Sequence, residues 1–260
     1  MIQLNHLERF RSITESGRTA YGCVLTSTDA GLAELAGEAG FDFAWIDLEH
    51  SPLTITDAAH LLMALRGTGC APFIRVAWNV PYLLKPALDL APAAVIIPMV
   101  NTAEEARRAA AACRYPADGG ERGFATRRAT GYGRMPLREY LEHSHGEPLV
   151  FVQIEHRDAV RNIDGILAAP GVDGVCIGPF DLSASYGKTG DFRDPEIAAA
   201  IDLVREKTLA AGLLLGGFCP DPEFWGTRFL HWKALSTDTD ALFRAYRSML
   251  QSQRSIQEEE

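Results

Sequence analysis

The stretch LVFVQIEHRDAVRNIDGILAAPGVDGVCIGPFDLSAS, residues 149–185, decides the fold class. It begins with an apolar run, residues 149–154, that ends on Glu155, and a second apolar run, residues 174–180, ends on Asp181. A helical segment separates the two runs, so the stretch predicts a β/α/β unit with parallel strands. The carboxyl ends of parallel strands meet at one edge, where α/β proteins bind ligands, and we expect both carboxylates to lie side by side there.

Two interpretations of this pair of carboxylates are open. Glu155 and Asp181 could each begin the helix that follows, because acidic residues favour the positive end of the helix dipole. They could instead hold a hard metal cation, which prefers carboxylate oxygen. The turn Gly178-Pro179, directly before Asp181, moves the balance toward the second interpretation without settling it.

Similar apolar runs recur along the whole chain, about 25–35 residues apart, a spacing typical of β/α units. They predict eight strands covered on both faces, at residues 20–25, 43–48, 72–77, 94–100, 149–154, 174–177, 213–218 and 229–235. Eight parallel strands within 260 residues predict an α/β protein with one domain over residues 1–260, a (β/α)₈ TIM barrel. The polar tail, about residues 253–260, is expected to fray.

Composition narrows the class of partner. The net charge of −9 disfavours nucleic acid or an anionic membrane as the main partner, whereas small-molecule substrates fit. The five cysteines are spread singly and read as reduced residues of a cytoplasmic protein. The sequence shows neither a leader pattern nor an apolar run of membrane-spanning length.

Further candidate residues follow the second and third predicted strands. His50 could be a structural histidine or an acid/base group, and Asp47, three residues earlier, could orient its imidazole. Arg75 lies within an apolar strand, where an unpaired charge is very costly. It is therefore either half of a structural ion pair or a ligand for an anion.

Residues 114–148 are too long for a simple connection between a helix and a strand. We expect this insertion on the face that carries the carboxylates, as a lid or a subunit contact. Its effect on specificity is left open by the sequence.

Five segments taken together resemble the HpcH/HpaI aldolase family, which comprises class II pyruvate aldolases. They are IDLEHSP (46–52), FIRVAWN (73–79), IIPMVN (96–101), VQIE (152–155) and IGPFDLSASYG (177–187). The resemblance runs in the same order over residues 20–238. It implies a (β/α)₈ barrel whose last helix is exchanged with a neighbouring subunit, in homo-oligomers that reach a hexamer as a trimer of dimers.

The resemblance also implies a divalent metal cation, Mg²⁺ or Mn²⁺ with Co²⁺ as an alternative, held by Glu155 and Asp181. Arg75 then matches the residue that binds the keto oxygen of pyruvate, and His50 matches the acid/base residue. The other matching positions are Asp47 and Asp89 as acidic helpers of the histidine, Gln153 as a polar residue at or beside the metal, and the turn Gly178, Pro179, Phe180 and Asp181, whose N–H groups meet the substrate carboxylate.

These residues predict an aldehyde-lyase that reversibly cleaves a 4-hydroxy-2-oxo acid to an aldehyde and pyruvate or a close analogue such as hydroxypyruvate. A related carbon–carbon lyase or synthase acting on a CoA thioester or oxaloacetate is the nearest alternative, and a non-catalytic barrel that binds 2-oxo acids is the second. Phe180 stands where the family often has a small residue. We therefore expect a pocket that is narrower or differently shaped.

Overall fold

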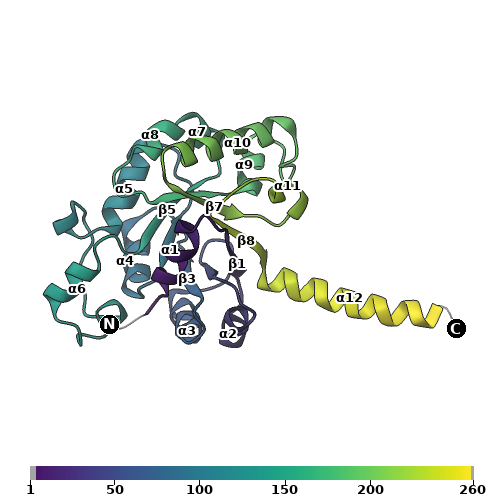
Figure 1. The fold of residues 1–260 in the computed structure, drawn as a ribbon, viewed down its shortest axis with the longest axis horizontal. Coiled ribbons are helices and arrows are strands. Elements are labelled where there is room, and N and C mark those ends of the chain that lie inside the picture. Colours follow the sequence, from purple (N-terminus) through teal and green to yellow (C-terminus); the bar gives the residue numbers. More distant parts are fainter. Residues whose placement is uncertain (1–3, 259–260) are drawn as a thin grey trace.

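Eight parallel strands close into a barrel in the order of the sequence, as the computed structural model shows for the described residues, 4–258 (Figure 1). This confirms the predicted TIM barrel. The strands are β1 (Ala20–Leu25), β2 (Phe43–Asp47), β3 (Ala71–Arg75), β4 (Ala94–Ile97), β5 (Leu149–Ile154), β6 (Gly174–Ile177), β7 (Leu214–Phe218) and β8 (Trp232–Thr237). β4 ends three residues before its predicted end at 100, and β8 begins three residues after its predicted start at 229 and continues through polar residues to Thr237.

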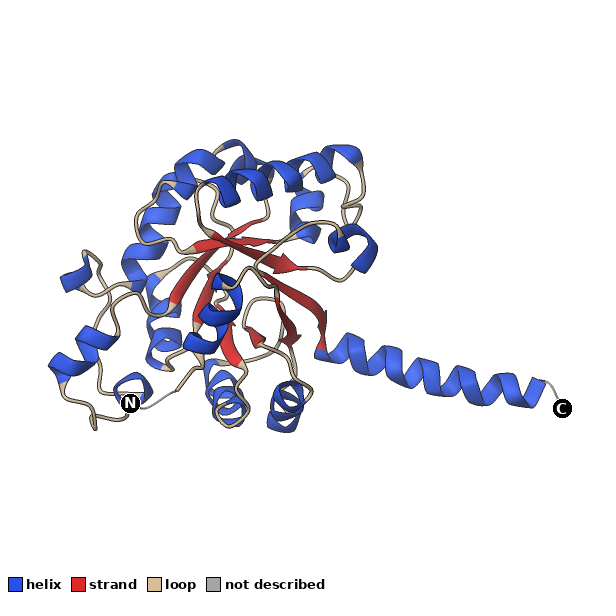
Figure 2. Cartoon of the chain, in the orientation of Figure 1, coloured by secondary structure: helices blue, strands red, loops and turns tan. Residues whose placement is uncertain are grey.

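Helices form an outer layer around these strands (Figure 2). They are α1 (Leu7–Glu15), α2 (Ala30–Glu38), α3 (Ile55–Leu65), α4 (Pro81–Asp89), α5 (Ala103–Cys113), α6 (Leu137–His143), α7 (Arg157–Arg161), α8 (Ile163–Leu167), α9 (Pro179–Ser185), α10 (Pro195–Ala210), α11 (Pro222–Gly226) and α12 (Asp238–Glu258), with short 3₁₀ turns at Pro116–Asp118 and Arg128–Thr130. None of the helices in this range is long and apolar enough to cross a membrane.

Aromatic side chains fill the barrel interior. Phe43 stacks on Phe73 with ring centroids 4.7 Å apart, and Phe151 stacks on Trp232 at 5.1 Å. Phe10 of α1 closes the amino-terminal end, 5.0 Å from Phe73. Burying each such ring stabilises the fold by about 1.5–3 kcal/mol. The barrel is therefore a packed core, and polar chemistry is confined to its carboxyl-terminal end.

The prediction that the insertion, residues 114–148, lies on the face that carries the carboxylates is wrong. The insertion joins α5 to β5, and a helix that follows a barrel strand ends beside the amino-terminal ends of the strands. Arg122 and Arg128 hold it there, because they donate to the carbonyl oxygens of Leu88 at 3.1 Å and Leu90 at 2.6 Å, at the carboxyl-terminal end of α4. The insertion therefore lies at the opposite end from the carboxylates of the same chain.

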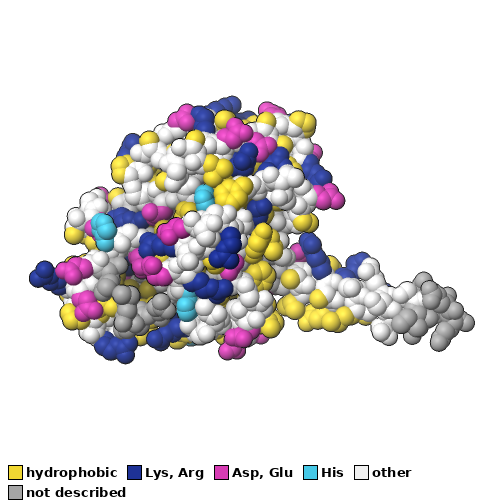
Figure 3. Space-filling view, in the orientation of Figure 1, with side chains coloured by type: hydrophobic (Ala, Val, Ile, Leu, Met, Phe, Trp, Pro, Cys, Tyr) yellow, Lys and Arg dark blue, Asp and Glu magenta, His cyan; other side chains and the backbone are white. Residues whose placement is uncertain are grey.

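The last helix, α12, leaves the barrel and extends away from it (Figure 1). Phe243, Tyr246, Met249 and Leu250 are each more than half exposed, and apolar side chains are visible along the helix in Figure 3. The tail that was expected to fray continues as helix to Glu258, and residues 259–260 lie outside the described residues. An apolar face of this kind is unusual on a helix that contacts only water.

Candidate active site

A cavity of about 210 Å³ opens at the carboxyl-terminal end of the barrel. The predicted site residues that line it are Asp47, His50, Arg75, Gln153, Gly178, Pro179, Phe180 and Asp181. A larger cavity, about 410 Å³, lies between α1 and the insertion and is lined by none of the predicted site residues. The smaller cavity is therefore the candidate site, because the titratable and polar groups converge on it.

Asp47 and Arg75 form a buried ion pair at the ends of β2 and β3. The two residues are partners in the strand register, and Arg75 donates from Nε at 2.8 Å and from Nη2 at 2.7 Å to the two carboxylate oxygens. Burial alone would lower the pKa of Arg75, but the hydrogen bonds and charge of Asp47 raise it. The ring of Trp45 lies under the guanidinium, 4.8 Å from it. The ion pair with Asp47 therefore fixes the orientation of the Arg75 guanidinium.

Glu49 is the acidic residue that the sequence reasoning missed. Its Oε2 lies 3.0 Å from Nη1 of Arg75, and its backbone N–H donates to Asp47 Oδ1 at 3.0 Å. Burial raises the pKa of Glu49 to about 7, with the charges of Asp47 and Asp181 acting in the same direction and Arg75 against them. The signal was present in the segment IDLEHSP, where this glutamate directly precedes His50.

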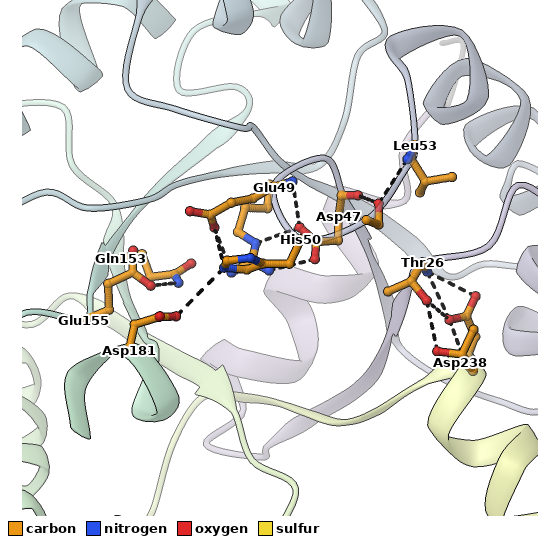
Figure 4. A network of polar contacts seen from close by, with 12 residues as sticks. Thr26, Asp47, Glu49, His50, Leu53, Gln153, Glu155, Asp181 and Asp238 are labelled. Atoms are coloured by element: carbon orange, nitrogen blue, oxygen red, sulfur yellow. Dashed lines mark hydrogen bonds and ion pairs between the residues drawn. The ribbon is translucent and has the colours of Figure 1, made fainter. Parts of the chain in front are cut away.

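His50 has different neighbours from those expected. Its Nε2 lies 3.8 Å from Glu49 Oε2 and 3.9 Å from Asp181 Oδ2, as Figure 4 shows. The expected pairing of His50 with Asp47 is wrong for the described residues, because Arg75 and the N–H of Glu49 occupy the Asp47 carboxylate. Since the imidazole is more than half exposed, it can exchange protons at the mouth of the cavity.

Glu155 lies directly behind the cavity wall at the end of β5. It accepts from the N–H of Met99 at 2.7 Å and from the side-chain amide of Gln153. Met99 has a φ of 53°, in the left-handed region that a non-glycine residue rarely adopts, and this conformation aims its N–H at the carboxylate. Burial raises the pKa of Glu155 to about 7, and the charge of Glu49 adds to the effect.

Gly178 permits the close approach of β6 to this carboxylate. A Cβ on Gly178 would lie 2.8 Å from Glu155 Oε2 and 2.9 Å from Gln153 Nε2. Asp181 follows in the first turn of α9, and its side chain is half exposed toward the cavity. The two carboxylates therefore lie side by side at the ends of β5 and β6, as the sequence predicted (Figure 4).

The donor set fits a hard divalent cation. No cluster of three or more His, Cys, Asp or Glu side chains within residues 4–258 is arranged as a metal cage. Mg²⁺, however, is commonly held by one or two carboxylates while it keeps several waters. The buried Oε1 of Gln153 has no hydrogen-bond partner among the described residues, so a further oxygen acceptor is free beside Glu155 and Asp181.

Asp89 is the predicted residue that the structure separates from the site. It is the last residue of α4, five residues before β4 begins at Ala94, so it lies near the amino-terminal ends of the strands. Burial raises the pKa of its carboxyl, whereas Arg122, Arg127 and Lys85 lower it. His50 follows the carboxyl end of β2. Within one chain the two residues are therefore at opposite ends of the barrel, and the structure does not bring Asp89 to His50.

Known proteins share both the sequence and this fold. The model of the HpcH/HpaI aldolase/citrate lyase family matches residues 20–236. A hydroxypyruvate/pyruvate aldolase from Roseobacter denitrificans is 38% identical over 213 residues, 80% of this chain and 82% of that protein. The chain belongs to the HpcH/HpaI aldolase/citrate lyase family. All the candidate site residues of this family member lie inside the matched region.

Two further relatives of this HpcH/HpaI protein support the same family assignment. A 4-hydroxy-2-oxo-heptane-1,7-dioate aldolase from Escherichia coli is 38% identical over 245 residues, 91% of each chain. The crystal structure of an HpcH/HpaI aldolase/citrate lyase family protein from Burkholderia cenocepacia superposes with a TM-score of 0.88 at 32% identity, over 95% of this chain and 98% of that one. The predicted enzyme class, a carbon–carbon lyase of the aldolase type, is confirmed by these relatives.

Proposed function

We propose that this protein reversibly cleaves a 4-hydroxy-2-oxo acid to an aldehyde and pyruvate or hydroxypyruvate, with a divalent cation at Glu155 and Asp181. One observation carries the proposal. Arg75, held by Asp47, and Asp181 line one cavity, and Glu155, which contacts no arginine or lysine side chain among the described residues, lies directly behind its wall. The relatives named as hydroxypyruvate/pyruvate aldolase and 4-hydroxy-2-oxo-heptane-1,7-dioate aldolase support this reaction.

The cation, when bound, supplies Lewis-acid polarisation of the substrate keto group. Arg75 stabilises the same oxygen as negative charge develops on it. A guanidinium has five N–H donors, of which Asp47 takes two and Glu49 contacts one nitrogen, so N–H groups remain for a substrate oxygen. Because Asp47 fixes the guanidinium in advance, this stabilisation requires little reorganisation during the reaction.

His50 is the proposed proton carrier. In cleavage, the proton of the 4-hydroxyl group passes to Nε2 of His50, directly or through one water, and the C3–C4 bond breaks. The electron pair stays on C3 as the pyruvate enolate, and the hydroxyl-bearing carbon leaves as the aldehyde. Protonation of C3 then gives pyruvate. The carboxylates of Glu49 and Asp181 lie 3.8 Å and 3.9 Å from this Nε2.

The turn Gly178-Pro179-Phe180-Asp181 is the proposed seat of the substrate carboxylate. It opens α9, for which no side chain in the described part of the chain serves as an N-terminal cap. The first N–H groups of a helix have no acceptor within it, so those of Phe180 and Asp181 can donate to an anion. We include Gln153 as the polar residue that positions Glu155 beside the cation.

We also propose that α12 is exchanged with a neighbouring copy, in a homo-oligomer. The support is its exposed apolar face, which includes Phe243 and Tyr246 at about 60% exposure. Light scattering coupled to size exclusion should give a mass of at least two chains. The double variant Phe243→Ser/Tyr246→Ser should shift the mass toward one chain, and an unchanged mass would remove the support for exchange.

Proton NMR of pyruvate in D₂O tests the catalytic proposal. With Mg²⁺ or Mn²⁺, the wild-type protein should exchange the methyl protons for deuterium, because the enolate forms reversibly. Arg75→Ala and a chelated wild-type sample should both lose the exchange, by about 100-fold or more for the arginine variant. Absence of exchange with every divalent metal tried would refute enolate formation from pyruvate.

A further inference from the structure

The last strand passes into the last helix without a connecting residue. β8 ends at Thr237 and α12 begins at Asp238, whereas every other strand is separated from the following helix by at least one residue. A helix that folds back along its own strand in an α/β unit usually follows a connection of about 2–6 residues. Since β8 runs directly into α12, the helix leaves the barrel, and its first turn stays at the carboxyl-terminal end of β8 (Figure 1).

The first turn of α12 is bonded to the segment that follows β1. The carboxylate of Asp238 accepts from the hydroxyl of Thr26 at 2.6 Å and from the backbone N–H groups of Thr26 and Ser27, each at 3.0 Å (Figure 4). The hydroxyl groups of Thr26 and Thr239 lie 3.2 Å apart. Asp238 therefore ties the beginning of the last helix to the end of the first strand.

These bonds reach the lining of the catalytic cavity. Thr26 follows β1, Thr237 ends β8, and both side chains line the cavity. Thr237 is also the cap of α12, because its hydroxyl accepts from the N–H of Asp240 at 3.0 Å. We call the pair Thr26 and Thr237 the α12 margin. This side of the cavity is thus held by the helix that leaves the barrel.

The α12 margin borders the part of the cavity where the carbon–carbon bond is made in the proposed function. The seats proposed for the keto oxygen and the carboxylate of pyruvate are Arg75, at the end of β3, and the turn that opens α9, after β6. Gln153 of β5 lines the cavity between these two seats. In the closed barrel β8 and β1 lie across from β4 and β5, so the α12 margin borders the space that remains for C3 and the aldehyde.

We propose that Asp238 is a positioning residue for the aldehyde side of the reaction, because it holds Thr26 in place and so makes the first turn of α12 part of the active site. The inference rests on the proposed function and adds a residue that acts through Thr26. Its contacts are made within one chain, and groups that a neighbouring copy adds at the mouth of the cavity do not replace them. A displacement of about 1 Å in a site can slow a reaction by about 100-fold.

The test makes two measurements on each variant of the metal-loaded enzyme. The first is the exchange of the methyl protons of pyruvate, which needs no aldehyde, and the second is the condensation of pyruvate with propanal. The ratio of kcat/KM for propanal to the exchange rate therefore isolates the aldehyde side. Asp238→Ala should lower this ratio about tenfold, mainly through KM for propanal. Asp238→Asn keeps one side-chain oxygen that can accept from Thr26, and it should recover part of the loss.

Two further variants show whether Asp238 acts through Thr26. Thr26→Val removes the hydroxyl with little change of shape, and the double variant Asp238→Ala/Thr26→Val should match Asp238→Ala within about twofold, since both changes remove the same contact. Asp240→Ala is the matched control. The carboxylate of Asp240 bonds to Ser236 and Arg244, which lie outside the cavity lining, and alanine keeps the backbone N–H that the cap uses. The ratio should therefore change less than about twofold.

The mass of Asp238→Ala separates this role from the loss of a neighbouring copy. Light scattering should give the wild-type mass, because the apolar face of α12 is unchanged. If Asp238→Ala lost mass, and Phe243→Ser/Tyr246→Ser lowered the ratio as much, the inference would be overturned, since the missing neighbour would be the cause.

The remaining outcomes distinguish the inference from the function on which it rests. Methyl-proton exchange in the wild type, together with a ratio that Asp238→Ala leaves within twofold, would overturn the role of Asp238 and leave the proposed function standing. Equal falls in Asp238→Ala and Asp240→Ala would also overturn that role, because a general disturbance of the start of the helix would be responsible. Absence of exchange in the wild type overturns both.

Discussion

The two acidic walls of the site differ in how their charge is balanced. At the ends of β2 and β3, Asp47 and Glu49 share one buried arginine, Arg75. At the ends of β5 and β6, Glu155 and Asp181 contact no arginine or lysine side chain among the described residues. Glu155 is instead held by the neutral N–H groups of Met99 and the amide of Gln153. The wall at β5 and β6 therefore lacks a positive charge of the kind that Arg75 supplies at β2 and β3.

Keeping the carboxylate of Glu155 buried without a cation has a free-energy cost. Burial disfavours an ionised carboxylate, and the raised pKa of Glu155 records the penalty. Both oxygens of Glu155 accept a hydrogen bond, one from the N–H of Met99 and one from the side-chain amide of Gln153, but neither donor carries a positive charge. The proposed divalent cation would remove this penalty. Wall β2–β3 is therefore fixed in advance, whereas wall β5–β6 would be completed by the proposed cation.

The largest expected effect comes from removing the built-in cation. Arg75→Leu leaves the carboxylate of Asp47, which is 2% exposed, buried without a cationic partner. We expect the free energy of unfolding to fall by about 3–5 kcal/mol. Urea denaturation followed by circular dichroism measures this loss.

The double variant Arg75→Leu/Asp47→Leu is the control for that measurement. Replacing both partners of a buried ion pair by apolar residues is often nearly neutral, so the double variant should lose clearly less stability than the single one. Equal losses would mean that the packing of the guanidinium against Trp45, and not its charge, is what matters at this wall.

A smaller effect is expected from the pH dependence of the other wall in metal-free protein. Because the folded pKa of Glu155 is raised from 4.5 to about 7, the folded state binds more protons than the unfolded state between these values. Its contribution to stability is thus fully present below pH 4.5 and is lost as the pH rises through 7, by up to about 1.4 kcal/mol per pH unit. Melting temperatures at pH 5, 6 and 7 test this, and Glu155→Gln should flatten the profile.

The exposed member of the same wall provides the matched comparison, with the smallest expected effect. Asp181→Asn should change the stability of the metal-free protein by no more than about 0.5 kcal/mol, because that side chain is half exposed. Both variants should nevertheless lose the stabilisation that Mg²⁺ gives the wild type at pH 7. If Mg²⁺ stabilised the variants as strongly as the wild type, the cation would bind elsewhere.

Local patterns in the sequence predicted the barrel and the positions of two carboxylates at strand ends. The strands at residues 20–25, 149–154 and 174–177 were predicted with the bounds that the structure has, because each is a short apolar run between helix signals. Parallel strands then place Glu155 and Asp181 together without any knowledge of their side-chain contacts. The residues of a site could be predicted where their position follows from strand ends alone.

Pairings across strands could not be predicted in the same way. Asp47 was assigned to His50 because the two are close in sequence, but it bonds to Arg75, 28 residues away, across the register of β2 and β3. Glu49 was missed because its raised pKa comes from its burial beside that pair, which the sequence does not display. In each case the partner is chosen by three-dimensional proximity, which a single sequence does not display.

The sequence by itself thus determined the alternation of strands and helices, the barrel that eight such units form, and the carboxylates at its catalytic end. Only the tertiary structure decided which charges are neutralised, where Asp89 and the insertion lie, and that α12 extends away from the barrel. The physical reason is the range of the forces involved. Hydrophobic periodicity and helix signals extend over a few neighbouring residues, so they can be recognised in the sequence. Ion pairs and desolvation depend on residues that folding brings together.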